Sequence, residues 1–264
     1  LEKNKDHIPN LFEYKNERVF RNYKPLKKAD APRGVVGIPR VLNMYENYPF
    51  WFTFFTKLGY SVKLSPVSSR KIYELGIESI PSESECYPAK LAHGHVTWLI
   101  KQGVKFIFYP CVPYEHKEIE KTNNHYNCPI VTSYAENIKN NVKAIKNITF
   151  ISDYLGIFDE RKFEKSIYEI LKKYFNDITM KEIKEASKKA YYEYKYHLAD
   201  IRVRGKEIIE EARKEGKQII VLAGRPYHVD PEVNHGIDKL IAGFDVAIVT
   251  EESIAYLEEK FPVN

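Results

Sequence analysis

The chain has 264 residues, of which 44% are hydrophobic and 14% aromatic, enough to bury the core of one large or two modest globular domains. Its 41 basic and 36 acidic residues leave a formal net charge of +5. The basic residues are spread along the chain, so we expect no nucleic-acid partner. The apolar runs are too short to cross a bilayer and no secretory signal is visible. We therefore expect no membrane partner and a cytoplasmic location.

Residues 1–33 and 34–155 differ in character. The first stretch is polar and basic, is interrupted by Pro25 and Pro32, and is predicted to be an N-terminal arm. The second is predicted to be an α/β lobe. Its expected strands are 35–38, 60–65, 105–109, 129–133 and 148–152, and its expected helices are 48–58, 71–76, 88–102 and 135–144. The first strand-helix-strand pass requires a right-handed crossover and a parallel sheet, which binds ligands at the ends of its strands.

Residues 156–217 are predicted to be a helical connector. They contain almost no Gly or Pro, and their apolar residues recur mostly at three- or four-residue steps. The pattern predicts a helix over 163–175 and one long helix over 180–215. At about 1.5 Å per residue the long helix spans roughly 50 Å, so we expect it to join two lobes.

Residues 218–264 begin a second strand-turn-helix-strand pass, with strands over 218–223 and 245–250 and a helix over 235–242. Gly224-Arg225-Pro226-Tyr227 corresponds to Gly37-Ile38-Pro39-Arg40 of the first pass, which indicates a degenerate internal repeat. Two strands and one helix are too few for an independent domain. We interpret this part as the start of a truncated second α/β lobe, and the chain as a piece of a longer polypeptide.

All three cysteines lie beside prolines at the ends of predicted elements. Cys86 comes just before a helix, Cys111 just after a strand, and Cys128 just before the strand predicted over 129–133. An odd number of cysteines in a cytoplasmic protein argues against a disulfide framework. The separations, 111 − 86 = 25 and 128 − 111 = 17, are unlike the close pairs of ferredoxins or zinc ribbons. Spacing alone therefore leaves both a shared metal site and three unrelated thiols open.

Five motifs resemble a known family: Gly37-Ile38-Pro39-Arg40, the stretch 82–90 around Cys86, Tyr109-Pro110-Cys111, Asn127-Cys128-Pro129, and Gly224-Arg225-Pro226-Tyr227-His228. They are similar to the C-terminal, dehydratase-like region of the acyl-CoA dehydratase activase-related proteins, and the resemblance covers nearly all of residues 34–264. It implies a four-iron four-sulfur (4Fe-4S) cluster on Cys86, Cys111 and Cys128, carried on flavodoxin-like lobes. It also implies an ATP-dependent activator as partner, which supplies one electron. In the dehydratases that electron reaches a 2-hydroxyacyl-CoA, which then loses water.

The chain departs from the full family pattern in two ways. It has no P-loop and no GxGxxG, so ATP chemistry is not expected within these residues. The second lobe is also incomplete, so we do not expect dehydratase turnover by this chain alone. With only three cysteines, one iron would be open to water, substrate or a non-cysteine ligand. A zinc site that combines the cysteines with His93, His95 or His125 is the alternative metal centre.

Charged residues near the motifs are the candidate substrate-binding groups. Arg40 and Arg225 occupy matching turns after strands, where each could hold a carboxylate or a CoA phosphate, or form a salt bridge that fixes the turn. Glu83 and Glu85 beside Cys86 could supply a cluster ligand, a proton or a helix cap, and capping is the simplest role. We take Arg40, Glu85 and Arg225 as the candidate substrate-binding residues.

The predicted fold is therefore α/β: a flavodoxin-like lobe with an open parallel sheet, a long helical connector, and a partial second α/β lobe. The favoured function is that of an iron-sulfur module in electron transfer to an acyl-CoA or a partner. The alternative is a non-catalytic module that docks an activator or dehydratase through the long helix and the arm, with incidental cysteines.

Overall fold

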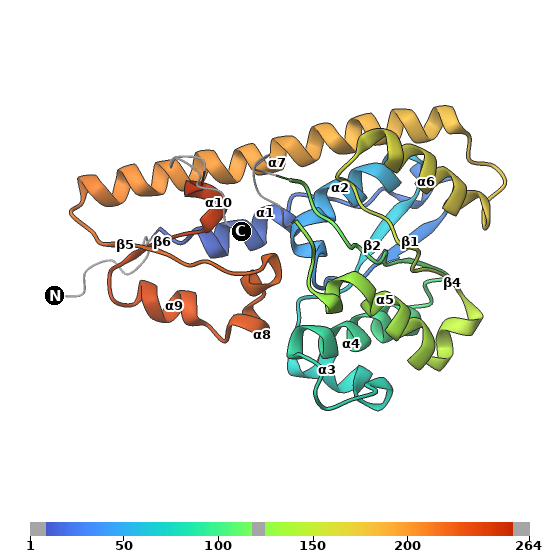
Figure 1. Cartoon of the computed structure of the whole chain (residues 1–264), viewed down its shortest axis with the longest axis horizontal. Helices are drawn as coiled ribbons and strands as arrows, with labels where there is room; N and C mark the ends of the chain where they lie inside the picture. The colour runs from blue at the N-terminus through green and yellow to red at the C-terminus, as the bar shows by residue number, and fades with distance from the viewer. Residues whose placement is uncertain (1–8, 118–124, 256–264) are drawn as a thin grey trace.

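A computed structural model describes residues 9–117 and 125–255 and places the first lobe around a four-stranded parallel sheet (Figure 1). Its strand order is β2-β1-β3-β4, with β1 at Val35–Ile38, β2 at Ser61–Leu64, β3 at Phe106–Phe108 and β4 at Thr149–Ile151. This is the open parallel α/β arrangement that the sequence predicts, with the flavodoxin-like order. Residues 1–8 of the predicted arm and 256–264 of the predicted second lobe lie outside the described residues.

Helix α2, at Met44–Lys57, is the centre of the hydrophobic core. Phe50, Trp51, Phe54 and Phe55 are each 0% exposed. One side of the helix faces the sheet, where the Trp51 ring lies 4.6 Å from that of Phe108. The other side meets the connector helices, because Phe50 lies 5.1 Å from Phe163 and 4.8 Å from Tyr191 between ring centres. The helix begins four residues before the predicted 48–58, and Pro49 lies inside it.

The remaining helices of the first lobe flank the sheet. They are α3 at Arg70–Gly76, α4 at Tyr87–Lys101 and α5 at Pro129–Asn141, with short 3-10 turns η1 at Lys28–Asp30, η2 at Ile77–Ser79 and η3 at Lys143–Asn147. Helices α3 and α4 pack closely: a Cβ added to Gly94 would stand 1.8 Å from the carbonyl oxygen of Ile72.

The strand predicted over residues 129–133 is wrong, because these residues begin helix α5. Cys128 has an extended backbone and is the N-cap, and its Sγ accepts a hydrogen bond from the backbone N of Val131 at 3.5 Å. Pro129 occupies the first helical turn, where its missing N–H costs nothing. The β-branched residues after it favour a strand locally, but this N-terminal capping and the buried Val131 and Tyr134 stabilise a helix.

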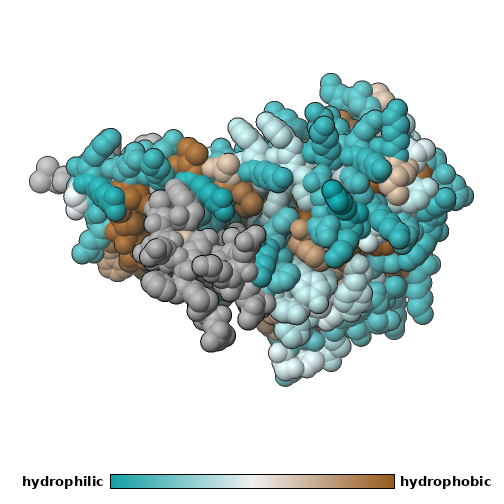
Figure 2. All heavy atoms as spheres, turned by 45° about the horizontal axis from the view of Figure 1, so that its top comes forward, coloured by the Kyte–Doolittle hydropathy of each residue, from teal (hydrophilic) through white to brown (hydrophobic). Residues whose placement is uncertain are grey.

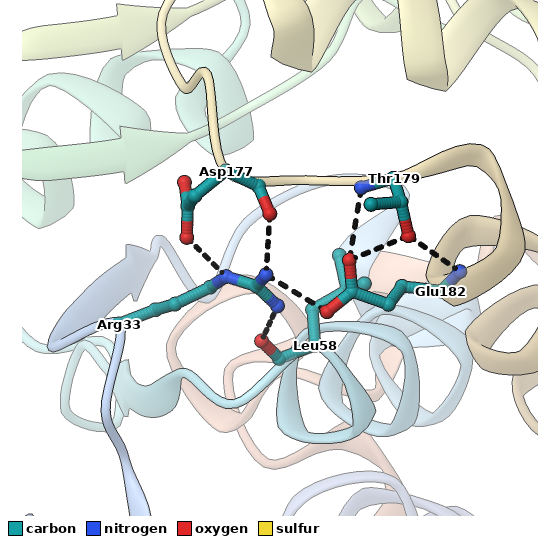
Figure 3. A network of polar contacts seen from close by, with 5 residues as sticks. All are labelled: Arg33, Leu58, Asp177, Thr179 and Glu182. Carbon is teal, nitrogen blue, oxygen red and sulfur yellow. Dashed lines mark hydrogen bonds and ion pairs between the residues drawn. The ribbon is translucent and has the colours of Figure 1, made fainter.

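Two helices connect the lobes: α6 at Glu160–Lys172 and α7 at Met180–Lys214, which has 35 residues and extends along the molecule (Figure 1). Thr179 and Glu182 form a capping box at the start of α7. Arg33 reaches the same place and pairs with Glu182 and Asp177, each at 2.8 Å (Figure 3). This network fixes the beginning of the long helix against the residues that lead into β1.

The second sheet has two parallel strands, β5 at Ile219–Val221 and β6 at Ala247–Val249. Around it lie α1 at Leu11–Phe20, η4 at Pro226–Val229, α8 at Pro231–Asn234, α9 at Ile237–Ala242 and α10 at Glu251–Ile254. The helix predicted over 235–242 starts two residues later, because His235 and Gly236 adopt left-handed backbone conformations with φ of 54° and 75°.

A small second core holds this part together. It consists of Leu11, Ile201, Ile208, Ala212, Ala247 and Val249, so α1 and α7 both pack on the sheet. Asn10 pairs with Ile248 along the outer edge of β6. Figure 2 shows a mostly hydrophilic surface with hydrophobic atoms at the end of the molecule that carries this sheet. Within the described ranges, none of the helices combines the length and hydrophobicity that a bilayer crossing requires.

Candidate functional site

Two of the three cysteines stand at helix N-termini. Cys86 is the N-cap residue of α4 and is exposed, and Cys128 is the N-cap residue of α5 and is partly buried. The unpaired N–H groups of a helix N-terminus give it a partial positive charge, which stabilises nearby anions. Both cysteines therefore lie where an anionic ligand is favoured.

Cys111 lies just beyond β3 and is 0% exposed. Its backbone is fixed on both sides, since its N–H donates to the Asp153 carbonyl at 3.2 Å and its carbonyl accepts from the Leu155 N–H at 2.8 Å. Burial raises the pKa of the Cys111 thiol, and the Glu136 carboxylate adds to this, while backbone groups of Glu136 and Ala135 in α5 act in the opposite direction. Cys111 therefore lies against α5, the helix that Cys128 begins.

The hydroxyl of Tyr109 lies near all three thiols. Tyr109 is 1% exposed, and within residues 9–117 and 125–255 its hydroxyl has no hydrogen-bond partner. Burial raises the pKa of Tyr109 most, and Cys111, Tyr134, Cys86 and Cys128 each raise it further through their charge. Three thiols from three different elements thus lie within electrostatic range of one buried, unpaired donor.

The histidines of the zinc alternative have other partners. His93 Nδ1 lies 2.8 Å from Ser79 Oγ, and its Nε2 lies 3.0 Å from the Tyr134 hydroxyl. His95 is held by Ser65 at 2.8 Å and Ser68 at 3.0 Å.

Burial lowers the pKa of His93 to about 4 and that of His95 to about 3, so both rings are neutral. His125 Nδ1 lies 3.0 Å from the Glu115 carbonyl oxygen. In the part of the chain that the structure describes, no three His, Cys, Asp or Glu side chains are placed to hold a single metal ion. These contacts give the zinc alternative no support.

The turn after β5 brings Arg225 to Cys128. Arg225, Tyr227 and Cys128 line the same small cavity, of ≈10 Å³, together with Asn43, Glu46, Glu115, Asn127, Val131 and Pro226. Burial raises the pKa of the Tyr227 hydroxyl, and Cys128 and then Cys86 raise it further. The second lobe therefore contributes three residues, Arg225, Pro226 and Tyr227, to the cavity beside Cys128.

Arg40, by contrast, lies away from this cavity. Its guanidinium stacks over the Phe20 ring at 4.2 Å and lines a groove of ≈470 Å³ between α1 and the second lobe. Burial lowers the pKa of Arg40, although Tyr45, Tyr48 and Asp230 oppose this. Its Nε has no hydrogen-bond partner among the described residues, so the salt-bridge interpretation of this turn is not supported there.

Glu85 lies near Cys86 and Tyr134, because the pKa of Tyr134, raised mainly by burial, is raised further by Glu85 and Cys86. The predicted capping role of Glu83 and Glu85 is not seen. Within the described ranges, neither carboxylate makes a hydrogen bond to the start of α4, and Glu83 instead accepts one from Lys90 Nζ at its backbone carbonyl, at 2.7 Å.

Three important residues escape sequence reasoning. Tyr109 was present in the motif Tyr109-Pro110-Cys111, but nothing in the sequence marks its hydroxyl as unpaired. Glu115 is held by Asn127 Nδ2 at 2.8 Å and faces the Cys128 cavity, and burial raises its pKa. Asp230, 2% exposed, accepts hydrogen bonds from the hydroxyls of Tyr45 and Ser68. Neither carboxylate lies in a recognisable motif.

The fold and this site define a two-lobed α/β protein in which Arg225 and Tyr227 of the second lobe line a cavity beside Cys128 of the first. Over residues 35–254 the chain matches the family described as CoA enzyme activase uncharacterised domain (DUF2229), and it belongs to that family. The matched range contains all three cysteines, Arg40, Tyr109 and Arg225. This confirms the predicted relation to the activase proteins. No curated protein and no solved structure matches the chain.

Proposed function

We propose that this chain is a dehydratase-like module of a CoA enzyme activase system that holds a 4Fe-4S cluster on Cys86, Cys111 and Cys128. In this role it accepts one electron from an ATP-dependent activator and passes it to an acyl-CoA-type substrate or a partner protein. The observation that carries the proposal is the buried, unpaired Tyr109 hydroxyl with all three thiols within electrostatic range.

We propose a cluster and not a single ion because the three cysteines come from separate elements. Ligands of one metal ion must crowd around one point, and the described residues contain no such group. Thiolates that bind different irons of a cluster stand farther apart and can approach from several elements, and these three cysteines belong to three separate parts of the first lobe. When bound, such a cluster supplies a one-electron carrier whose reduction potential depends on hydrogen bonds to its sulfurs and on its burial. The Tyr109 hydroxyl is available as such a donor.

Local electrostatics also support an anionic group here. Two of the proposed ligands, Cys86 and Cys128, are the N-cap residues of α4 and α5. Arg225 lines the cavity beside Cys128. The helix N-termini carry partial positive charges and Arg225 carries a full one. These charges would offset the negative charge of three thiolates, which is unfavourable among buried residues.

The substrate side of the proposal rests on two arginines. Arg225 lines the same cavity as Cys128 and would hold an anionic substrate group beside the cysteine site. Arg40, in the larger groove, suits a carboxylate or phosphate farther from the thiols. Glu85, near Cys86, is a candidate for contact with the same ligand.

Anaerobic reconstitution with iron and sulfide tests the ligand set. The wild-type chain should become brown, and Cys86→Ser, Cys111→Ser and Cys128→Ser should each lose most of the visible absorbance. Ser84→Ala, in the same loop as Cys86, is the matched control and should keep it. Retention of the full absorbance by the cysteine variants would contradict the assignment.

The docking alternative is favoured by one observation, the exposed apolar residues along α7. Tyr192 is 71% exposed and Val203 is 59% exposed on this helix. Such residues are candidates for contact with a partner. If docking is the only function, a chain with all three cysteines replaced by Ser should bind a purified ATP-dependent activator as tightly as the wild type, and Tyr192→Ser with Val203→Ser should weaken that binding.

A further inference from the structure

A segment of the second lobe covers the partly buried thiol of the first. This covering segment, residues 225–234, comprises Arg225, η4 and α8. Tyr227 lines the small cavity of Cys128 on one side. On its other side it lines a second cavity together with Tyr45, Ser68 and Asp230. Tyr227 therefore stands between Cys128 and the contacts that hold the segment in place.

Those contacts come from four separate parts of the chain. Asp230 accepts hydrogen bonds from Tyr45 in α2 and from Ser68 in the loop after β2. Glu232 accepts one from the Tyr87 hydroxyl in α4 at 2.8 Å. The Val229 carbonyl accepts one from Asn16 Nδ2 in α1 at 3.0 Å. We call Asp230 and Glu232, with these hydroxyl donors, the latch.

Asp230 is the best-secured member of the latch. It is 2% exposed, and besides the two hydroxyls it accepts the backbone N–H of Glu232 at 2.9 Å, which caps α8. Ser68 is itself fixed, because its Oγ lies 3.0 Å from His95 Nε2 and His95 Nδ1 lies 2.8 Å from Ser65. The backbone N–H of Arg40 donates to that same Ser65 at 2.7 Å. A buried chain of polar groups thus connects the turn after β1 to the covering segment.

The latch is polar, and the apolar attachment of the covering segment is small: Val229 enters the core and Tyr227 packs against it. A segment attached by a few hydrogen bonds and one or two apolar side chains opens more easily than a fully packed core. Cys111 belongs to the packed core and is 0% exposed. Opening of the covering segment would therefore expose Cys128 without disturbing Cys111.

We infer that Asp230 is a positioning residue: with Tyr45 and Ser68 it holds the covering segment closed, keeps Tyr227 against Cys128, and so controls access to the cysteine site from solvent or a partner. Glu232 with Tyr87 is the second attachment. The inference concerns the closed and open states of the chain itself and holds whether or not a cluster binds, so it can fail or succeed independently of the proposed function.

Thiol modification under native conditions tests it. The reduced chain is treated with N-ethylmaleimide, and the modification rate of each cysteine is followed by mass spectrometry of its peptide. In the wild type, Cys86 should react fastest and Cys111 slowest. Asp230→Ala should raise the rate at Cys128 by about tenfold or more, since loss of a buried carboxyl group that accepts several hydrogen bonds shifts an opening equilibrium by that order. The rate at Cys111 should not change.

Further variants separate the latch from general stability. Asp230→Asn keeps an oxygen acceptor and should restore much of the protection of Cys128, while Tyr87→Phe should raise its rate more weakly than Asp230→Ala. Asp245→Ala, an exposed carboxylate of the same lobe, is the control and should leave Cys128 unchanged. An unchanged rate at Cys128 in both Asp230→Ala and Tyr87→Phe, or a parallel increase at Cys128 and Cys111, would overturn the inference.

Discussion

Asp230 accepts a hydrogen bond from the hydroxyl of Tyr45, a residue 185 positions earlier in the chain. The contact joins the turn after β5 to the central helix of the first lobe, and both partners are buried. Burial raises the pKa of Asp230, and the hydrogen bonds from Ser68 and Tyr45 act in the opposite direction. The attachment of the second lobe thus depends on polar contacts in a place that water does not reach.

Replacing Tyr45 by Phe should therefore destabilise the chain. The variant keeps the ring in the core but removes one of the hydroxyl donors to a buried carboxylate, at a cost of about 1.5–3 kcal/mol. Urea unfolding followed by circular dichroism measures the change. Tyr192→Phe removes a hydroxyl from an exposed ring and should leave the midpoint unchanged. Equal midpoints for Tyr45→Phe and the wild type would show that the hydrogen bond is not formed.

The hydroxyls of Tyr109 and Tyr134 should respond differently to removal in the cluster-free chain. Tyr109 has no hydrogen-bond partner among the described residues, so Tyr109→Phe should change the free energy of unfolding by less than about 1 kcal/mol or even stabilise the chain. Tyr134→Phe removes the partner of His93 Nε2 and should cost about 1 kcal/mol or more. A larger loss for Tyr109→Phe than for Tyr134→Phe would mean that the Tyr109 hydroxyl is already paired.

The network at the start of α7 should make stability depend on acid pH. Hydrogen bonds from the backbone and side chain of Thr179, together with Arg33, lower the pKa of Glu182 from 4.5 to about 2 (Figure 3). A carboxyl whose pKa is depressed by folding stabilises the native state above its unfolded-state pKa, and this contribution is lost as pH falls through the folded-state value.

The advantage of the wild type over Glu182→Gln should therefore be complete at neutral pH and shrink between pH 4.5 and about 2. Because the Glu182 side chain is 38% exposed and solvent screens the pair, the difference at neutral pH should be only a few tenths to about 1 kcal/mol. Unfolding midpoints measured across this pH range test it. Glu185→Gln, at an exposed position one turn along α7, should show no such dependence. A difference that grows on acidification would contradict the assignment.

Gly94→Ala should destabilise the first lobe despite the better helix propensity of Ala. The propensity gain is at most about 1 kcal/mol. The new Cβ, however, would stand 1.8 Å from the Ile72 carbonyl oxygen, and backbone cannot rotate away as a side chain does. Overpacking of this kind typically costs about 1–3 kcal/mol, so the net effect should be a loss. Thermal unfolding of Gly94→Ala, with the exposed Lys101→Ala as control, should separate helix propensity from overpacking. A Gly94→Ala variant more stable than the wild type would refute the close packing of α3 on α4.

The sequence locates most elements of the first lobe because their hydrophobic patterns are strong and glycines end their helices. Helix α5 is the exception: its β-branched residues after Pro129 are typical of a strand, and only the capping by Cys128 and the packing of Tyr134 decide for a helix. Local preference is weak compared with tertiary contacts in such a short stretch. The corrected position makes Cys128, like Cys86, the N-cap residue of a helix.

The contacts at the candidate site lie beyond sequence reasoning for a physical reason. Asp230 and Ser68 are 162 residues apart, and their meeting depends on how the two lobes pack rather than on any local pattern. The same holds for Tyr109, whose motif is visible but whose lack of a partner follows only from the surrounding fold. The motifs thus predict the three cysteine ligands. The structure adds the unpaired Tyr109 hydroxyl and the latch at Asp230.

The most direct test of the central claim is the iron and acid-labile sulfide content of the chain after anaerobic reconstitution and removal of unbound metal. Three ligands that share one cluster predict about four irons and four sulfides per chain, with all three thiols protected from titration. A colourless protein with less than about one iron per chain and three freely titratable thiols would contradict it.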